Sequence, residues 1–139
     1  MAPTATCVTA AVASRVGSDG YEGGGGFRCA RARIYRSGHD RTPAVALRCD
    51  SNRSLIHRCR IDGYQDTLWA QNNLQVYLRC DIAGTIDFVY GNAKAIFQYC
   101  RLLVRNPGNG KHNAITAQGR NDPTSEESGL YSKVATSPP

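Results

Sequence analysis

Hydrophobic and polar positions alternate through the middle of the chain in short runs that are separated by turn residues. The runs have the length of β-strands, and no stripe with a period of 3.6 residues passes through them. They cover residues 44–47, 54–57, 67–70, 74–78, 85–90, 95–99, 102–104 and 114–116. The pattern predicts an all-β fold.

Cysteine positions add a weak repeat to this pattern. Arg-Cys or Tyr-Cys pairs end at Cys29, Cys49, Cys59, Cys80 and Cys100, and the steps 29–49, 59–80 and 80–100 span 20, 21 and 20 residues. A step of this size suits a stacked β-coil, in which residues one step apart lie about 4.8 Å apart on neighbouring turns. Coincidence among a few cysteines is the alternative interpretation.

The two ends of the chain differ from its middle. The first 26 residues are small and glycine-rich and end in four glycines, which predicts a flexible segment over residues 1–26. The end of the chain is polar and rich in Ser, Glu and Pro, which predicts a loose tail over residues 124–139. The β-coil region is therefore expected over residues 27–123.

The charge balance is basic, with 17 Lys and Arg against 11 Asp and Glu, a formal net charge of +6. This favours a polyanionic partner: nucleic acid, anionic lipid or an acidic polysaccharide. The arginines are dispersed, whereas a polynucleotide binder more often has a basic block, so we do not expect nucleic acid as the partner. No stretch is apolar enough to span a membrane, and residues 7–13 make a poor signal peptide.

The cysteines and histidines do not suggest a metal site. No cysteine pair has the spacing Cys-x-x-Cys, and His39, His57 and His112 are scattered, so we expect no bound metal. The even number of six cysteines is compatible with disulfides in an oxidising compartment, with their connectivity open. The sequon at Asn52 fits secretion, although such sequons often arise by chance.

Two carboxylates carry the candidate chemistry. Asp87 lies within the β-prone run 85–90, where an aspartate is disfavoured unless it is functional or paired, and Asp66 follows a glycine-containing turn that it could simply cap. They are 21 residues apart, one step of the proposed coil, which would stack their side chains. Two such charges about 5 Å apart repel by roughly 3 kcal/mol, which raises the pKa of one of them. A protonated acid beside an ionised carboxylate suits hydrolytic chemistry.

Three long motifs carry a family resemblance: CRIDGYQDTLWA at 59–70, GTIDFVYGNAKAIFQYC at 84–100 and ITAQGRNDP at 115–123. With AVALR at 44–48, they make the region from about 44 to 123 resemble the plant pectin methylesterases. The resemblance implies a right-handed parallel β-helix, a single-stranded solenoid without metal or organic cofactor. It also implies hydrolysis of methyl esters on polygalacturonate, by a protein secreted to the cell wall. An anionic polysaccharide partner agrees with the basic charge.

The resemblance also implies roles for four residues. Asp87 would be the nucleophile that attacks the ester carbonyl, and Asp66 would be the acid that protonates methanol and then the base that activates water. Gln65 would donate to the oxyanion of the tetrahedral intermediate. Tyr90 occupies a position where the family has an aromatic residue near the sugar, so it either stacks on substrate or belongs to the core.

Two departures from the family pattern leave a second interpretation open. The residue before AVALR, usually a glutamine of the oxyanion hole, is Pro43, which has no side-chain donor. The family's later Gly-Arg-Pro-Trp motif is absent, and the only tryptophan, Trp69, belongs to an earlier segment. We therefore expect a β-helix that is incomplete at its C-terminal end. The chain is then either an esterase of reduced activity or a non-catalytic relative that binds pectin.

Overall fold

The computed structural model describes residues 7–8, 28–30, 33–35, 42–108, 110–122, 124 and 127–133, and the described secondary structure consists of fourteen β-strands in three sheets. Sheet A contains β1 (Cys7–Val8), β4 (Leu47–Cys49), β7 (Leu68–Ala70), β10 (Val89–Gly91) and β13 (Thr116–Gln118). Sheet B contains β2 (Arg28–Ala30), β5 (Ser54–His57), β8 (Leu74–Leu78), β11 (Lys94–Gln98) and β14 (Gly129–Lys133). Sheet C contains β3 (Arg33–Tyr35), β6 (Arg60–Asp62), β9 (Asp81–Gly84) and β12 (Arg101–Val104).

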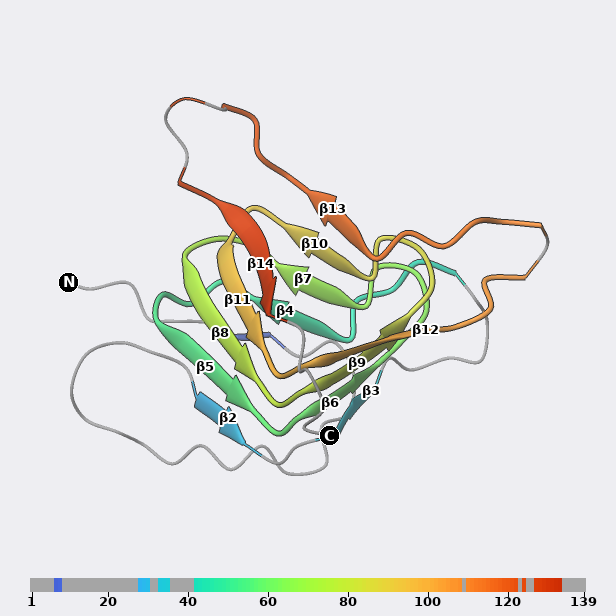
Figure 1. Ribbon diagram of the computed structural model, residues 1–139, viewed down its shortest axis with the longest axis horizontal. Coiled ribbons are helices and arrows are strands. Elements are labelled where there is room, and N and C mark those ends of the chain that lie inside the picture. Colours follow the sequence, from blue (N-terminus) through green and yellow to red (C-terminus); the bar gives the residue numbers. More distant parts are fainter. Residues whose placement is uncertain are drawn as a thin grey trace.

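The chain visits the three sheets in turn and forms a right-handed parallel β-helix (Figure 1). One coil runs through β4, β5 and β6, the next through β7, β8 and β9, and a third through β10, β11 and β12. All strand pairs are parallel apart from β1, which pairs with β4 in the antiparallel sense. The predicted all-β solenoid is confirmed.

The register gives the coil its length. Leu47 pairs with Leu68 and Leu68 with Val89, so each of these coils takes 21 residues. Cys59, Cys80 and Cys100 follow the ends of β5, β8 and β11 at the same corner, as the cysteine repeat predicts. The step from Cys29 to Cys49 is not a coil, because Cys29 belongs to sheet B and Cys49 to sheet A.

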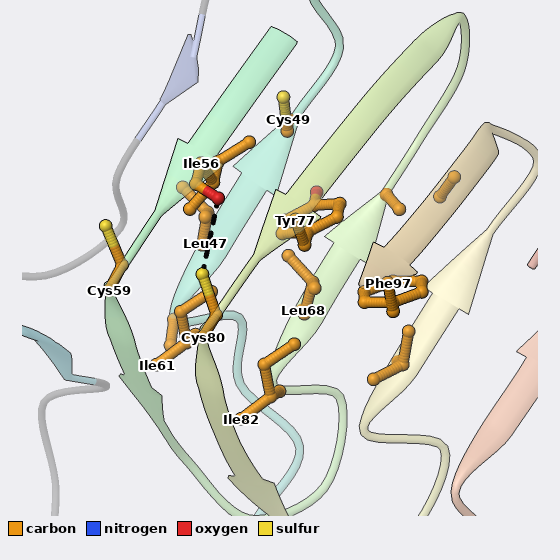
Figure 2. Close-up of a cluster of buried hydrophobic side chains, with 14 of the residues drawn as sticks. Leu47, Cys49, Ile56, Cys59, Ile61, Leu68, Tyr77, Cys80, Ile82 and Phe97 are labelled. Carbon is orange, nitrogen blue, oxygen red and sulfur yellow. Dashed lines mark hydrogen bonds between the residues drawn. The ribbon is translucent and has the colours of Figure 1, made fainter. Parts of the chain in front are cut away.

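The core fills the inside of the coil with columns of apolar side chains, one residue from each turn (Figure 2). In sheet B, Tyr77 is fully buried above Ile56, and its ring stacks on Phe97 with 4.7 Å between centroids. Gln75 is also fully buried; its amide donates to the carbonyl oxygens of Cys49 and Asn72, and its carbonyl accepts from the Tyr77 hydroxyl (2.7 Å). Because every polar group of Gln75 is paired, the core tolerates it.

A single residue with left-handed backbone turns the chain at each corner. Arg58, Arg79 and Tyr99 have φ of 54°, 53° and 54° between sheets B and C, and Asp66 and Asp87 have φ of 61° and 47° between sheets C and A. The run 85–90 was expected to be one strand, but it is a corner followed by β10, and Asp87 lies in that corner. Aspartate tolerates this backbone better than most residues.

The ends of the chain also differ in part from expectation. β14 (Gly129–Lys133) lies in the segment 124–139, which was expected to be loose, and all five of its residues pair with β11. Nearly all of segment 1–26 lies outside the described residues; within it, residues 7 and 8 form β1. No helix in the described ranges has the length and apolar character needed to span a bilayer.

Candidate active site

Asp66 and Asp87 lie at the same corner of neighbouring coils, just before β7 and β10. The Asp66 amide donates to the carbonyl oxygen of Ile86 (3.1 Å), and the Leu68 amide donates to that of Phe88 (2.8 Å), so the two corners are stacked by their backbones. Both aspartates are half-buried. The coil thus brings the two predicted carboxylates together on adjacent turns.

The close fit of the two corners depends on small residues. A Cβ on Gly84 would lie 2.2 Å from the Cβ of Phe88 and 2.6 Å from the carbonyl oxygen of Tyr64, so only glycine fits there. Thr67 is fully buried, and its hydroxyl lies within hydrogen-bond distance of the carbonyl oxygens of Tyr64 (3.0 Å) and Ala83 (3.2 Å). These contacts fix the backbone on both sides of each aspartate.

The environment of Asp66 favours its protonated form. Burial raises the pKa of the Asp66 carboxyl above its usual range, and the charge of Asp87 raises it further. The direction is the one that the spacing predicted, although the larger cause is burial and the like charge is the smaller one. The pair therefore contains a carboxyl group that gives up its proton less readily than an ordinary aspartate.

A column of larger side chains continues from the aspartates along the outer face of sheet A. Arg48, Trp69 and Tyr90 pair in register on β4, β7 and β10. The rings of Trp69 and Tyr90 stack with 5.7 Å between centroids, and the Arg48 guanidinium lies 4.7 Å from the centroid of the Trp69 ring. All three side chains are half-buried, so Tyr90 belongs to this outer column and not to the core.

This column lies close to the acid pair. Burial raises the pKa of the Tyr90 hydroxyl, the charge of Asp66 raises it further, and Arg48 acts in the opposite direction. Arg48 also donates to the Gln71 side chain and lies 3.8 Å from the Asp50 carboxylate. The outer face of sheet A thus carries aromatic ring faces beside carboxylates, an arrangement that suits sugar rings.

Sequence reasoning named Tyr90 but not Arg48 or Trp69 as parts of the site. The signal was present, because residues 48, 69 and 90 are 21 residues apart, the same step that separates the two aspartates. Adding one coil length to any outward-facing residue of sheet A identifies its neighbour in the column.

Gln65 and Pro43 occupy neighbouring coils at the same edge of the site. The Ala44 amide donates to the carbonyl oxygen of Gln65 (3.2 Å), so residue 43 lies beside Gln65 on the preceding turn. Gln65 is half-buried and Pro43 is exposed. Of these two positions, only Gln65 carries a side-chain donor next to the aspartates.

Arg105 and Ala114, in the connection between β12 and β13, contact the loops that carry the aspartates. Arg105 donates to the carbonyl oxygen of Gly63 and to the Asp62 carboxylate (3.0 Å each), and its guanidinium lies 5.2 Å from the centroid of the Tyr64 ring. The Ala114 amide donates to the carbonyl oxygen of Thr85 (3.2 Å). Across the described ranges, no group of three or more His, Cys, Asp or Glu side chains is arranged to hold a metal ion.

The fold and the site define a parallel β-helix protein with an aspartate pair at one corner of its coil. The family model described as Pectinesterase matches residues 23–136, most of the chain. The chain therefore belongs to the pectinesterase family.

Similarity to individual proteins agrees with this assignment. Pectinesterase 3 of Phaseolus vulgaris is 45% identical over 105 residues, which cover 76% of this chain and 18% of that protein. Pectinesterase 2.2 of Solanum lycopersicum is 54% identical over 80 residues, which cover 58% of this chain and 14% of that protein.

Two solved structures share the fold. The pectin methylesterase from carrot matches with a TM-score of 0.74 and 39% identity, over 77% of this chain and 34% of that one. The rice weevil pectin methyl esterase matches with a TM-score of 0.65 and 27% identity, over 74% of this chain and 30% of that one. The chain thus spans about a third or less of the length of these relatives.

Proposed function

We propose that this chain is a carboxylic ester hydrolase that removes methyl esters from pectin. The observation that carries the proposal is the stacking of Asp66 and Asp87 at one corner, with the pKa of Asp66 raised. The substrate class comes from the names of the related proteins, pectinesterase and pectin methylesterase. The net charge of +6 supports an anionic polymer as the partner.

In this proposal Asp87 is the nucleophile. Its ionised carboxylate attacks the ester carbonyl carbon of a galacturonate unit, and the carbonyl oxygen takes the negative charge in a tetrahedral intermediate. The Gln65 amide donates to that oxygen. The intermediate collapses when the bond to the methoxy oxygen breaks, which leaves the sugar carboxyl joined to Asp87 as an acyl-enzyme.

Asp66 moves the proton in both halves of the reaction. It enters protonated, which its raised pKa favours, and gives its proton to the departing methoxy oxygen, so that methanol leaves. The resulting Asp66 carboxylate then takes a proton from water, whose oxygen attacks the acyl carbon. Asp87 leaves as a carboxylate, the sugar carries a free carboxyl group, and Asp66 is again protonated.

The outer column of sheet A binds the sugars in this proposal. Trp69 and Tyr90 offer stacked aromatic surface beside Asp66, and Arg48 supplies a positive charge at the end of the column. Galacturonate rings would pack on the aromatic residues, with a free carboxylate near Arg48. We further propose that the protein is secreted and acts in the plant cell wall, where pectin is found.

Methanol release from highly methylated pectin tests the reaction. We expect release by the wild-type chain and a loss of about 10³-fold or more in Asp87→Asn, since asparagine accepts the left-handed corner but cannot form the acyl-enzyme. Equal release by the two proteins would rule out Asp87 as the nucleophile.

Non-catalytic pectin binding is the second candidate function, and Pro43 favours it. Loss of one oxyanion donor costs about 10²–10³ in rate, and position 43 has none. Trp69, the only tryptophan, reports occupancy of sheet A through its fluorescence. A change in its emission on adding methylated pectin, without any methanol, would identify a binding protein; a change accompanied by methanol identifies the esterase.

A further inference from the structure

A second, arginine-rich groove lies at the corner between sheets B and C. Arg58 and Arg79 hold the same corner position on successive coils, and Tyr99 holds it on the third. Arg60, Asp81 and Arg101 pair in register just beyond the corner, on sheet C. With Cys59, these side chains line a groove of about 390 Å³.

The charge of this groove is strongly positive. Four arginines face one aspartate among its lining residues. Arg101 holds both oxygens of the Asp81 carboxylate, at 2.7 Å and 2.5 Å, and is its main partner. Arg60 is shared between Asp62 (2.7 Å) and Asp81 (3.8 Å).

Two of the arginines remain for a ligand. Arg58 and Arg79 are exposed, and within the described part of the chain neither forms an ion pair. They stand one coil apart, about 4.8 Å along the axis of the β-helix. A guanidinium binds a carboxylate through two parallel hydrogen bonds, so this pair suits a ligand with carboxylates at regular intervals.

Tyr99 adds a feature that a purely ionic patch lacks. Its side chain is 43% exposed, and it continues the column of Arg58 and Arg79 on the next coil. An exposed aromatic ring packs against the apolar face of a sugar, and the arginines beside it select for acidic sugars. A methyl-esterified galacturonate is neutral and lacks the charge that the arginines recognise.

We propose that this groove binds de-esterified polygalacturonate, at a site separate from the aspartate pair. The proposal rests on the proposed function for the identity of the polymer. The corner between β8 and β9 lies across the coil from sheet A, as Figure 1 shows, so the two sites face different ways. The groove would anchor the protein to stretches of pectin that already carry free carboxylates, while the aspartate pair acts on an esterified unit.

Binding of the full chain to unesterified polygalacturonic acid at low salt tests the groove. We expect about tenfold weaker binding in Arg58→Gln/Arg79→Gln, the loss that two exposed charge contacts supply. The matched control is Arg53→Gln/Lys111→Gln, because it removes the same charge from exposed positions outside the groove, and Arg53 has the same φ of 54°. We expect the control to bind as the wild type does.

Equal binding by the groove variant and the wild type, or equal losses in the groove variant and its control, would overturn the proposal. At about 1 M salt the screening length falls to about 3 Å, and the difference between the variants should vanish. Duplex DNA at matched charge concentration serves as a competitor. Displacement of the polygalacturonate at equal or lower concentrations of DNA would refute a carboxylate polymer as the ligand.

The esterase reaction is measured separately in the same proteins. Methanol release by Arg58→Gln/Arg79→Gln should equal that of the wild type, and Asp87→Asn should keep its binding to polygalacturonic acid. A wild-type chain that releases no methanol, but loses binding when Arg58 and Arg79 are replaced, would contradict the proposed reaction and leave the groove supported. Loss of polygalacturonate binding in Asp87→Asn would instead place the polymer on sheet A and overturn the groove.

Discussion

At Gly91 the backbone lies against the preceding coil, and replacing this glycine should cost a large part of the stability of the fold. Its φ is +125°, and a Cβ at this position would lie 2.0 Å from the carbonyl oxygen of Ala70 on the preceding coil. That oxygen accepts a hydrogen bond from the Ala93 amide (3.1 Å), so it cannot move away without breaking the ladder. Neither the backbone at residue 91 nor the carbonyl group of Ala70 can move without a large cost in free energy.

The magnitude follows from two separate costs. A side chain at this φ costs about 1–3 kcal/mol of backbone strain, and forcing atoms into a packed interior costs about 1–3 kcal/mol more. We expect Gly91→Ala to lower the free energy of unfolding by about 4 kcal/mol. For a chain of this size each kcal/mol shifts Tm by about 3–5 °C, so thermal or urea unfolding measures the loss readily.

Gly110→Ala is the matched control for Gly91→Ala. Gly110 also has a positive φ, +66°, but a Cβ there meets no atom within 4 Å. Only the backbone cost of about 1–2 kcal/mol then remains. Equal losses in the two variants would show that the contact with Ala70 carries no energy and would refute the reasoning.

Three further predictions concern the core and the acid pair. Tyr77→Phe should lower the free energy of unfolding by about 1–3 kcal/mol in urea titrations, because it removes the donor to the buried oxygen of Gln75. Asp66→Asn should stabilise the fold at neutral pH. Because the pKa of Asp66 is raised in the folded state, the wild-type protein loses stability as the pH rises above the ordinary aspartate value of 3.8. Asparagine does not titrate, so the variant avoids this loss. Pro43→Gln should raise methanol release by up to about 10²-fold, because it adds a donor beside Gln65.

Each of these predictions has its own control or contrary outcome. Tyr131→Phe, at a side chain that is 55% exposed, should leave stability unchanged, so equal effects at both tyrosines would discount the buried hydrogen bond. A stabilisation by Asp66→Asn that persists unchanged down to the pH where Asp66 is protonated would contradict the titration argument. Pro43→Leu relaxes the backbone without adding a donor, and a gain as large as that of Pro43→Gln would point to the proline ring as the cause.

The solenoid was predictable from the sequence because similar residues recur about once per coil, at positions that face the same way on each turn. Strands β5 and β8 have the predicted bounds, since their apolar positions alternate and their ends carry turn residues. In sheet C, β12 was predicted at 102–104, but β6 and β9 were not detected. These two strands are three and four residues long and contain Arg60, Asp62 and Asp81. The three charges pair with one another and with Arg101 and Arg105. Because so many of their residues are charged, the sequence does not show that the inner sides of these strands are buried.

The candidate site was only partly predictable. The 21-residue step placed Asp66 and Asp87 together, but Asp87 was expected within a strand, because Ile86, Phe88 and Val89 all favour β structure. The left-handed backbone at Asp87 overrides that preference, and it depends on the close fit of Gly84 against the neighbouring corner, which local sequence does not encode. The roles of Asp66, Asp87 and Gln65, like that of Tyr90, stay predictions for the assays above.

Unequal coil lengths have a consequence for how such a site can change. Successive pairs in sheet A are 21 residues apart up to Val89, but Val89 pairs with Thr116, 27 residues further on. The strands keep their pairing, and the extra residues fall in the connection between β12 and β13, where the Ala114 amide donates to the carbonyl oxygen of Thr85, two residues before Asp87. Insertions at this corner can therefore reshape the surroundings of the two carboxylates without refolding the protein, because the strand ladder beneath them keeps its spacing.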